Sequence, residues 1–238
     1  QERNSMVQKP LVIYHGPGCL DGMAAAWCAH QHFGDHAEYQ IGSYQSNEPI
    51  DFADRDVFMV DFSYKREFLL ENILPFANNV FMIDHHKSAI DELWDLPAKI
   101  DNFFMCNSRI ENSGAFLALE WFGGKEARAP KVLLHIQDRD LWKFNMEHTK
   151  EITAALYSQK DLDYKSIGRF MTDSKIMYDR LVAQGKTLSA AHDKEVDVLM
   201  KIARRNVMLH YGQFDPDGNF DGEDCIVIAL VNAPPKYS

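Results

Sequence analysis

An aspartate and two histidines stand together where a buried strand is expected to end. Asp84, His85 and His86 directly follow the apolar run Val80-Phe81-Met82-Ile83. Carboxylates and imidazoles are common protein ligands of divalent transition metals. The tripeptide therefore predicts a metal site.

Two further apolar runs end in residues of the same kind. Residues 11–14 lead into His15, and residues 57–60 lead into Asp61. Short apolar runs separated by helical patterns are typical of buried parallel strands, and open parallel sheets bind ligands at the carboxyl ends of their strands. We therefore expect His15, Asp61 and the tripeptide to meet at one edge of a sheet.

The loop that follows His15 offers two more donors, Cys19 and Asp21, among several glycines that permit close approach to a ligand. Imidazole and carboxylate suit Mn, Fe, Co or Zn, whereas a thiolate shifts the preference toward softer ions. Taken alone, Cys19 is just as well explained as a small buried apolar residue.

A second pair of aspartates, Asp138 and Asp140, follows a helix predicted for residues 126–136. One of them is expected to complete the site, while the other serves as a capping or surface residue; our interpretation favours Asp138. Asp61 is expected to bridge two cations, because it lies on a middle strand and a carboxylate has two oxygens.

The elements that must position these residues alternate between strand and helix. The patterns predict strands at 11–14, 37–41, 57–60, 80–83 and 225–231, and helices at 21–33 (with Asp21 as N-cap), 65–77, 113–122, 126–136 and most of 151–205. The expected fold class is α/β, with a parallel sheet flanked by helices. We expect a catalytic domain at 8–148, a helical remainder or connector at 149–208, and the start of a smaller α/β domain at 209–238. A long helix that closes the first domain is the alternative to a connector.

Composition narrows the function classes. The formal charge is −10, from 25 basic and 35 acidic residues, which argues against a broad grip on long nucleic acids. The four cysteines show no paired spacing, which favours a reducing compartment. No apolar run approaches the ~20 residues that span a bilayer. We expect a cytoplasmic protein with no membrane partner.

Over residues 11–145, the ordered motifs resemble the DHH phosphoesterase family, which is named for a tripeptide like the one at 84–86. The resemblance implies two divalent ions, usually manganese, at the carboxyl edge of a parallel sheet. His15 and Asp61 would bind one ion. The other would be held by Asp21, Asp61, His85 and Asp138.

The resemblance also implies that His86 contacts the substrate phosphate and that Asp84 supports the histidine pair. Cys19 stands where the family generally has an aspartate, so a softer ion such as Zn, Fe or Co is an alternative to the expected Mn. The predicted helix start at Ser113 and Gly114 could offer backbone N–H groups to phosphate, or Ser113 could be an ordinary helix cap.

Two metal ions ~3.5–4 Å apart lower the pKa of a bridging water and neutralise charge on a phosphoryl group. We therefore expect a metal-dependent phosphodiesterase whose partners are small nucleotides or short single-stranded oligonucleotides, including linear or cyclic dinucleotides. Hydrolysis of pyrophosphate or polyphosphate is one alternative, and a nucleotide-binding module without turnover, suggested by Cys19, is another. Residues 225–234 resemble an early strand of the family's second domain (DHHA1-type), and a homodimer is compatible with this reading.

Overall fold

The computed structural model describes residues 8–42, 50–106 and 111–206. These residues form an α/β fold around a five-stranded sheet with the strand order β2-β1-β3-β4-β5. All neighbouring strands are parallel. The strands are β1 (Leu11–His15), β2 (Glu38–Gly42), β3 (Asp56–Val60), β4 (Asn79–Ile83) and β5 (Phe103–Met105). The predicted parallel sheet is confirmed.

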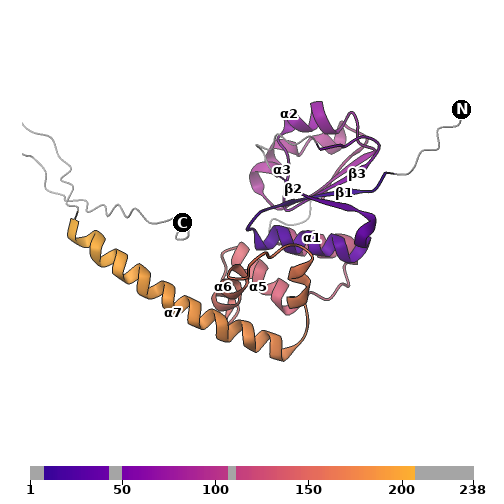
Figure 1. Cartoon of the computed structure of the whole chain (residues 1–238). Coiled ribbons are helices and arrows are strands. Elements are labelled where there is room, and N and C mark those ends of the chain that lie inside the picture. Colours follow the sequence, from indigo (N-terminus) through magenta and orange to yellow (C-terminus); the bar gives the residue numbers. More distant parts are fainter. Residues whose placement is uncertain (1–7, 43–49, 107–110, 207–238) are drawn as a thin grey trace, which may run out of the picture. The chain divides into compact units, whose positions relative to one another are not determined.

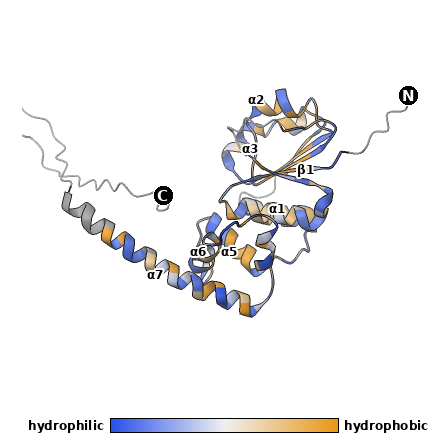
Figure 2. Ribbon diagram, in the orientation of Figure 1, coloured by the Kyte–Doolittle hydropathy of each residue, from blue (hydrophilic) through white to orange (hydrophobic). Residues whose placement is uncertain are grey.

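Both faces of the central strands β1, β3 and β4 are largely buried, which explains why these strands read as nearly continuous apolar runs. Successive side chains of a strand point to opposite faces. Val12 and Val60 accordingly belong to one apolar core cluster, and Ile13 and Met59 belong to the other. All four side chains are fully buried. Figure 2 shows the apolar strands enclosed by helices with polar outer surfaces.

Helices cover the two faces unequally (Figure 1). On one face, α1 (Leu20–Phe33) packs against α4 (Gly114–Gly123), and both contribute to the larger core cluster together with α5 (Lys131–Asp140) and α6 (Thr149–Tyr157). On the other face lie α2 (Arg66–Phe68), the π-helical turn η2 (Leu69–Ile73) and α3 (Lys87–Leu93). The short 3₁₀ helices are η1 (Gly34–His36), η3 (Leu96–Ala98) and η4 (Ser166–Phe170).

Helix α1 approaches its neighbours closely because its buried face carries small side chains. Ala24, Ala25, Ala26 and Ala29 are all fully buried. Small residues let the backbones of α1 and α4 come near each other, and this brings the N-termini of both helices to the same edge of the sheet as Asp61. The alanine-rich pattern of the sequence thus helps to position the site.

Several boundaries differ from the sequence-based expectation. The helix predicted for 126–136 begins at Lys131, after Pro130, and continues to Asp140. The region 151–205 is interrupted between α6 and the long helix α7 (Lys175–Asn206). Strand β5 was not anticipated, because its three residues are too short to show a pattern.

The first compact unit of the chain extends to Gly185. Residues 149–185, which the sequence assigns to a helical remainder, therefore belong to the same unit as the sheet. The second unit begins at Lys186. The strand expected at 225–231 and the domain start expected at 209–238 lie outside the described residues. Among the described helices, none combines the length and apolar character needed to cross a bilayer.

Candidate metal centre

Asp61 lies at the middle of the candidate site. It directly follows β3, its carboxylate is almost completely buried, and its backbone adopts a positive φ of 52°. Its amide donates to the carbonyl of Ile83 at 3.0 Å, which ties the turn to the end of β4. A left-handed backbone is unfavourable for a residue with a Cβ, and such conformations concentrate at functional sites.

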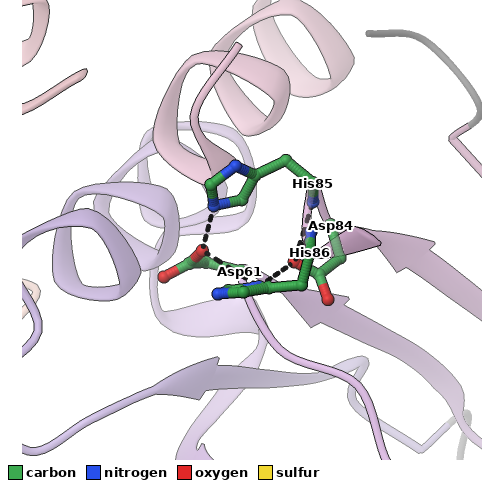
Figure 3. A group of neighbouring side chains, drawn as sticks. All are labelled: Asp61, Asp84, His85 and His86. Carbon is green, nitrogen blue, oxygen red and sulfur yellow. Dashed lines mark hydrogen bonds and ion pairs between the residues drawn. The ribbon is translucent and has the colours of Figure 1, made fainter. Parts of the chain in front are cut away.

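The two carboxylate oxygens of Asp61 face two different groups of ligand-type side chains. Oδ2 lies 3.6 Å from His15 Nδ1 and 3.5 Å from Cys19 Sγ. Oδ1 lies 3.4 Å from His85 Nε2 and 4.0 Å from His86 Nδ1. Figure 3 shows the carboxylate between the two imidazole rings of the tripeptide. One carboxylate thus faces two sets of donors.

The first ligand group consists of His15, Cys19 and Asp61, whose donor atoms all lie within 4.8 Å of one another. Cys19, rather than Asp21, is the N-cap of α1, and its Sγ accepts a hydrogen bond from the Gly22 amide at 3.4 Å. Burial, reinforced by the charge of Asp61, raises the pKa of the Cys19 thiol. Without a cation, Cys19 is therefore a thiol that donates to Asp61, and a bound cation would favour the thiolate.

The second ligand group consists of Asp21, His85 and Asp140, again with donor atoms within 4.8 Å of one another. His85 Nε2 lies 3.4 Å from Asp140 Oδ2. Four buried atoms of this region have no hydrogen-bond partner, namely Asp21 Oδ1, Asp61 Oδ1, His85 Nε2 and Asp140 Oδ2. Buried polar atoms of folded proteins are nearly always satisfied. A cation held by Asp21, His85 and Asp140 would satisfy three of these atoms, and the fourth, Asp61 Oδ1, lies 3.4 Å from His85 Nε2.

The charges of the site also favour a cation. Burial raises the pKa of Asp21 well above its ordinary value, and the charges of Asp61 and Asp140 add to this effect. Burial and the charge of Asp61 likewise raise the pKa of Asp140. Burial acts on Asp61 in the same direction, but the His15 and His85 imidazoles, 3.6 and 3.4 Å away, outweigh it and lower the pKa of Asp61 to about 2. Three crowded carboxylates, with imidazoles and one thiol, form a donor set that fits Mn, Fe, Co or Zn.

The structure brings Asp140, and not Asp138, to these ligands. Asp138 is used elsewhere: its Oδ1 accepts from the Asn145 amide at 2.8 Å, and its Oδ2 accepts from the Met146 amide at 3.1 Å and the Thr149 hydroxyl at 2.6 Å. Side chains two positions apart on an α-helix point roughly 200° away from each other. Only one of the two aspartates can therefore face the cluster. The candidate ligand is therefore Asp140, and the prediction of Asp138 was wrong.

Asp138 also ends a chain of buried hydrogen bonds. The Thr149 hydroxyl donates to Asp138, so at its 2.9 Å contact with His135 Nδ1 it acts as the acceptor. This fixes the His135 tautomer, and Nε2 accepts from the Tyr178 hydroxyl at 3.2 Å. Asp138 therefore joins α5, the start of α6 and the start of α7.

Asp84 holds the two histidines of the tripeptide in place. Its buried Oδ1 accepts from the amides of His85 and His86 at 2.8 and 3.3 Å, and it lies 2.6 Å from His86 Nδ1. The hydrogen bond to Asp84 raises the pKa of His86 to about 9. With Nδ1 engaged, Nε2 of the half-exposed His86 is the nitrogen available to a ligand.

The N-terminus of α4 is occupied by a carboxylate of the chain itself. The amide of Ala115 donates to Asp21 Oδ2 at 3.2 Å. Ser113 is completely buried, and its hydroxyl accepts from the Phe116 amide at 3.4 Å, as an ordinary helix cap does. Ser113 and the start of α4 thus position Asp21, which does not fit the expected contact with substrate phosphate.

Gly114 has a role that the sequence did not reveal. A Cβ at Gly114 would lie 2.5 Å from both Cβ and Oδ1 of Asp61. The absence of a side chain is therefore what lets α4 reach the bridging carboxylate. The Ser-Gly pair was visible as a helix start, but its contact with a residue 53 positions earlier was not.

Comparison with known proteins adds one relative. No protein-family model matches the sequence. The chain is 32% identical over 176 residues to a protein of Acanthamoeba polyphaga mimivirus named "Uncharacterized protein R106", and the match covers 66% of this chain and 40% of the viral protein. The chain thus spans less than half the length of this relative, whose name assigns no activity. Functional conclusions therefore rest on the site.

Proposed function

We propose that this chain is a metal-dependent phosphodiesterase of the DHH type that hydrolyses short oligonucleotides or linear or cyclic dinucleotides. The observation that carries the proposal is the position of Asp61, whose two oxygens face separate ligand groups at 3.4–3.6 Å. Two divalent ions supply charge neutralisation at the phosphoryl group and an activated nucleophile in hydrolases of this kind. Manganese is the first candidate ion, and Cys19 keeps Zn, Fe and Co as candidates.

The residues divide into ligands and supporting groups. His15, Cys19 and Asp61 would hold one ion, and Asp21, Asp61, His85 and Asp140 the other. Asp84 positions the histidines by accepting three hydrogen bonds.

His86 is the group that we assign to the substrate phosphate. Its side chain is 46% exposed and lines a cleft of about 160 Å³ together with His15 and Asp61. Asp84 engages Nδ1 at 2.6 Å, which leaves Nε2 of His86 to face a ligand. A histidine N–H donor at this place suits a non-bridging phosphate oxygen.

The cleft supports a small substrate. Ser63 and Ser88 also line it with their hydroxyl-bearing side chains, and Lys65 and Glu92, which pair at 3.1 Å, lie in the same lining. A cleft of this size accommodates the phosphate and adjoining atoms of a short substrate, and the net charge of −10 disfavours a long duplex.

The decisive experiment compares substrates and counts metal ions. The full chain, loaded with Mn²⁺, should bind two ions and release mononucleotide from a dinucleotide such as pApA. Asp61→Ala should lose both ions and all turnover, because it removes the shared carboxylate. Release of phosphate from pyrophosphate without any dinucleotide cleavage would instead establish a phosphoanhydride hydrolase. Nucleotide binding without hydrolysis in Mn, Co, Zn or Fe would establish a binding module.

A further inference from the structure

A buried serine lies in the cleft without a hydrogen-bond partner. Ser63 follows Asp61 by two positions, is 4% exposed, and lines the cleft together with His86. Within residues 8–42, 50–106 and 111–206, which the structure describes, no group is hydrogen-bonded to the Ser63 hydroxyl. Buried polar groups nearly always have such a partner. The hydroxyl is therefore available to a molecule in the cleft.

The other buried serines and threonines of the described residues are all satisfied by the chain. The Ser113 hydroxyl accepts from a backbone amide at 3.4 Å. The Thr149 hydroxyl donates to a carboxylate at 2.6 Å, and the Thr153 hydroxyl donates to a backbone carbonyl at 2.8 Å. None of these three lines the cleft. Ser63 thus differs from them both in its position and in its free hydroxyl.

Two aromatic neighbours fix the position of Ser63. Phe62 and Tyr64 are both buried in the smaller apolar core cluster, and the centres of their rings lie 4.9 Å apart. Both residues also contribute to the wall of the cleft. The backbone between them is held by this packing, so Ser63 needs no hydrogen bond of its own to stay in place. A group that is positioned in advance loses little entropy when it binds a ligand.

The rest of the lining has the mixed character that suits a sugar. Lys65 and Glu92 pair with each other at 3.1 Å, so their charges compensate. Ser88 adds a second hydroxyl, and Ala89 adds apolar surface to that of the aromatic residues. A second phosphate would gain little from a lysine that is already paired. A pentose instead offers hydroxyls to the polar groups and carbon atoms to the apolar ones.

We propose that this part of the cleft binds the ribose next to the phosphate that is hydrolysed, and that Ser63 hydrogen-bonds with its 2′-hydroxyl. This inference rests on the proposed function and names ribonucleotides, rather than deoxyribonucleotides, as the substrate class. The 3′-oxygen of an internal nucleotide is esterified, so the 2′-hydroxyl is the one that remains free. A 2′-hydroxyl both donates and accepts, and it is the group by which a protein distinguishes RNA from DNA.

The test compares wild type with two variants of the full chain. Ser63→Ala removes the proposed contact. Ser158→Ala is the matched control, because Ser158 does not line the cleft and its hydroxyl donates to the Ala155 carbonyl at 2.8 Å. One measurement is kcat/KM for pApA and for the same dinucleotide with 2′-deoxyribose. The other is the affinity of the Mn²⁺-loaded protein for AMP, 2′-deoxy-AMP and inorganic phosphate by calorimetry.

Wild type should prefer the ribose form of both ligands by roughly three- to tenfold, which corresponds to one neutral hydrogen bond. Ser63→Ala should bring this preference close to one by weakening only the ribose form. Its affinity for inorganic phosphate should stay within about twofold of wild type on the same scale. Ser158→Ala should keep the wild-type preference. If Ser63→Ala does not fold, Ser63→Gly provides the same comparison.

Equal affinity of wild type for AMP and 2′-deoxy-AMP would overturn the inference, and so would an unchanged preference in Ser63→Ala. A matching loss of affinity for inorganic phosphate in Ser63→Ala would also overturn it, because the hydroxyl would then contact the phosphate. The outcome is separable from the proposed function. If wild type cleaves neither dinucleotide but prefers AMP in a way that Ser63→Ala abolishes, the proposed activity fails and the ribose site stands.

Discussion

Asp140 faces the ligand groups, whereas Asp138 accepts hydrogen bonds from the chain. The same substitution at the two positions should therefore have opposite effects. Asp140→Asn should weaken metal binding while stabilising the metal-free chain. Asp138→Asn should destabilise the fold while leaving metal binding nearly unchanged. Both variants replace a carboxylate by an amide of the same shape near the end of one helix, so each serves as the control of the other.

The magnitude for Asp140 follows from charge repulsion. Its donor atom lies within 4.8 Å of that of Asp21, and burial together with Asp61 raises its pKa. Two unit charges at that distance repel by roughly 3 kcal/mol at an effective dielectric constant of 20. This value is an upper limit for the repulsion between Asp21 and Asp140, because their raised pKa values reduce the charge and His85 lies close to Asp140. We expect Asp140→Asn in EDTA to gain about 1–3 kcal/mol, or a Tm rise of about 2–10 °C. The Mn²⁺ affinity of this variant should fall at least about tenfold. Losing a residue that only hydrogen-bonds to a metal ligand already costs about that much, and Asp140 is a candidate ligand itself.

The magnitude for Asp138 follows from its hydrogen bonds. Its two oxygens accept from two amides and the Thr149 hydroxyl at 2.6–3.1 Å. An asparagine has only one acceptor oxygen. Its NH₂ group would face an N–H or O–H donor of the chain and could not accept that hydrogen bond. Hydrogen bonds to a charged group contribute about 1.5–3 kcal/mol each, so we expect a loss of about 3 kcal/mol and a Tm fall of roughly 10 °C.

Thermal unfolding by circular dichroism in EDTA, with calorimetric titration of Mn²⁺, measures both effects. The reasoning would be refuted if Asp138→Asn lost metal affinity at unchanged Tm while Asp140→Asn kept it. It would also be refuted if Asp140→Asn lowered the Tm in EDTA, since the crowded carboxylates would then not repel.

Three further predictions concern the same region. Burial, with a smaller effect of Lys131, lowers the pKa of His135 to about 4, so the folded state resists its protonation. The free energy of unfolding should therefore fall by up to about 1.4 kcal/mol per pH unit as pH drops from 6.5 toward 4. Chemical denaturation at several pH values should show a weaker pH dependence of stability for His135→Gln. Gly114→Ala places a Cβ 2.5 Å from Asp61, so both stability (by about 1–3 kcal/mol) and Mn²⁺ affinity should decrease, and a variant that titrates like wild type would contradict this contact. Cys19→Asp should shift metal preference toward Mn²⁺ over Zn²⁺ in competition experiments, whereas an unchanged preference would show that the thiol only caps α1.

Much of the fold was predictable because its signals are local. The runs before His15, Asp61 and Asp84 are strands in the structure, and each ends within one residue of the predicted position. Buried parallel strands require apolar residues on both faces, and this requirement is visible in four or five consecutive positions. The predicted N-cap of α1, Asp21, was wrong, because Cys19 caps the helix two residues earlier.

The candidate site was predictable only in part. The loop offers His15, Cys19 and Asp21 as donors, but its spacing does not show how they divide: in the structure His15 and Cys19 face Asp61 Oδ2, and Asp21 groups with His85 and Asp140. A turn at the start of α1 separates the donors, and side-chain direction at a turn depends on backbone angles that spacing does not reveal.

The tripeptide at 84–86 and the aspartate at 61 were determined by the sequence alone, because a strand end followed by ligand-type residues is a local pattern with few alternatives. Only the tertiary structure decided which aspartate of α5 faces the cluster and why position 114 must be glycine. These features depend on the rotation of a helix and on contacts between distant segments. Asp138 and Asp140 are chemically identical and two residues apart, so the sequence could name the pair, while the packing of α5 selected between them.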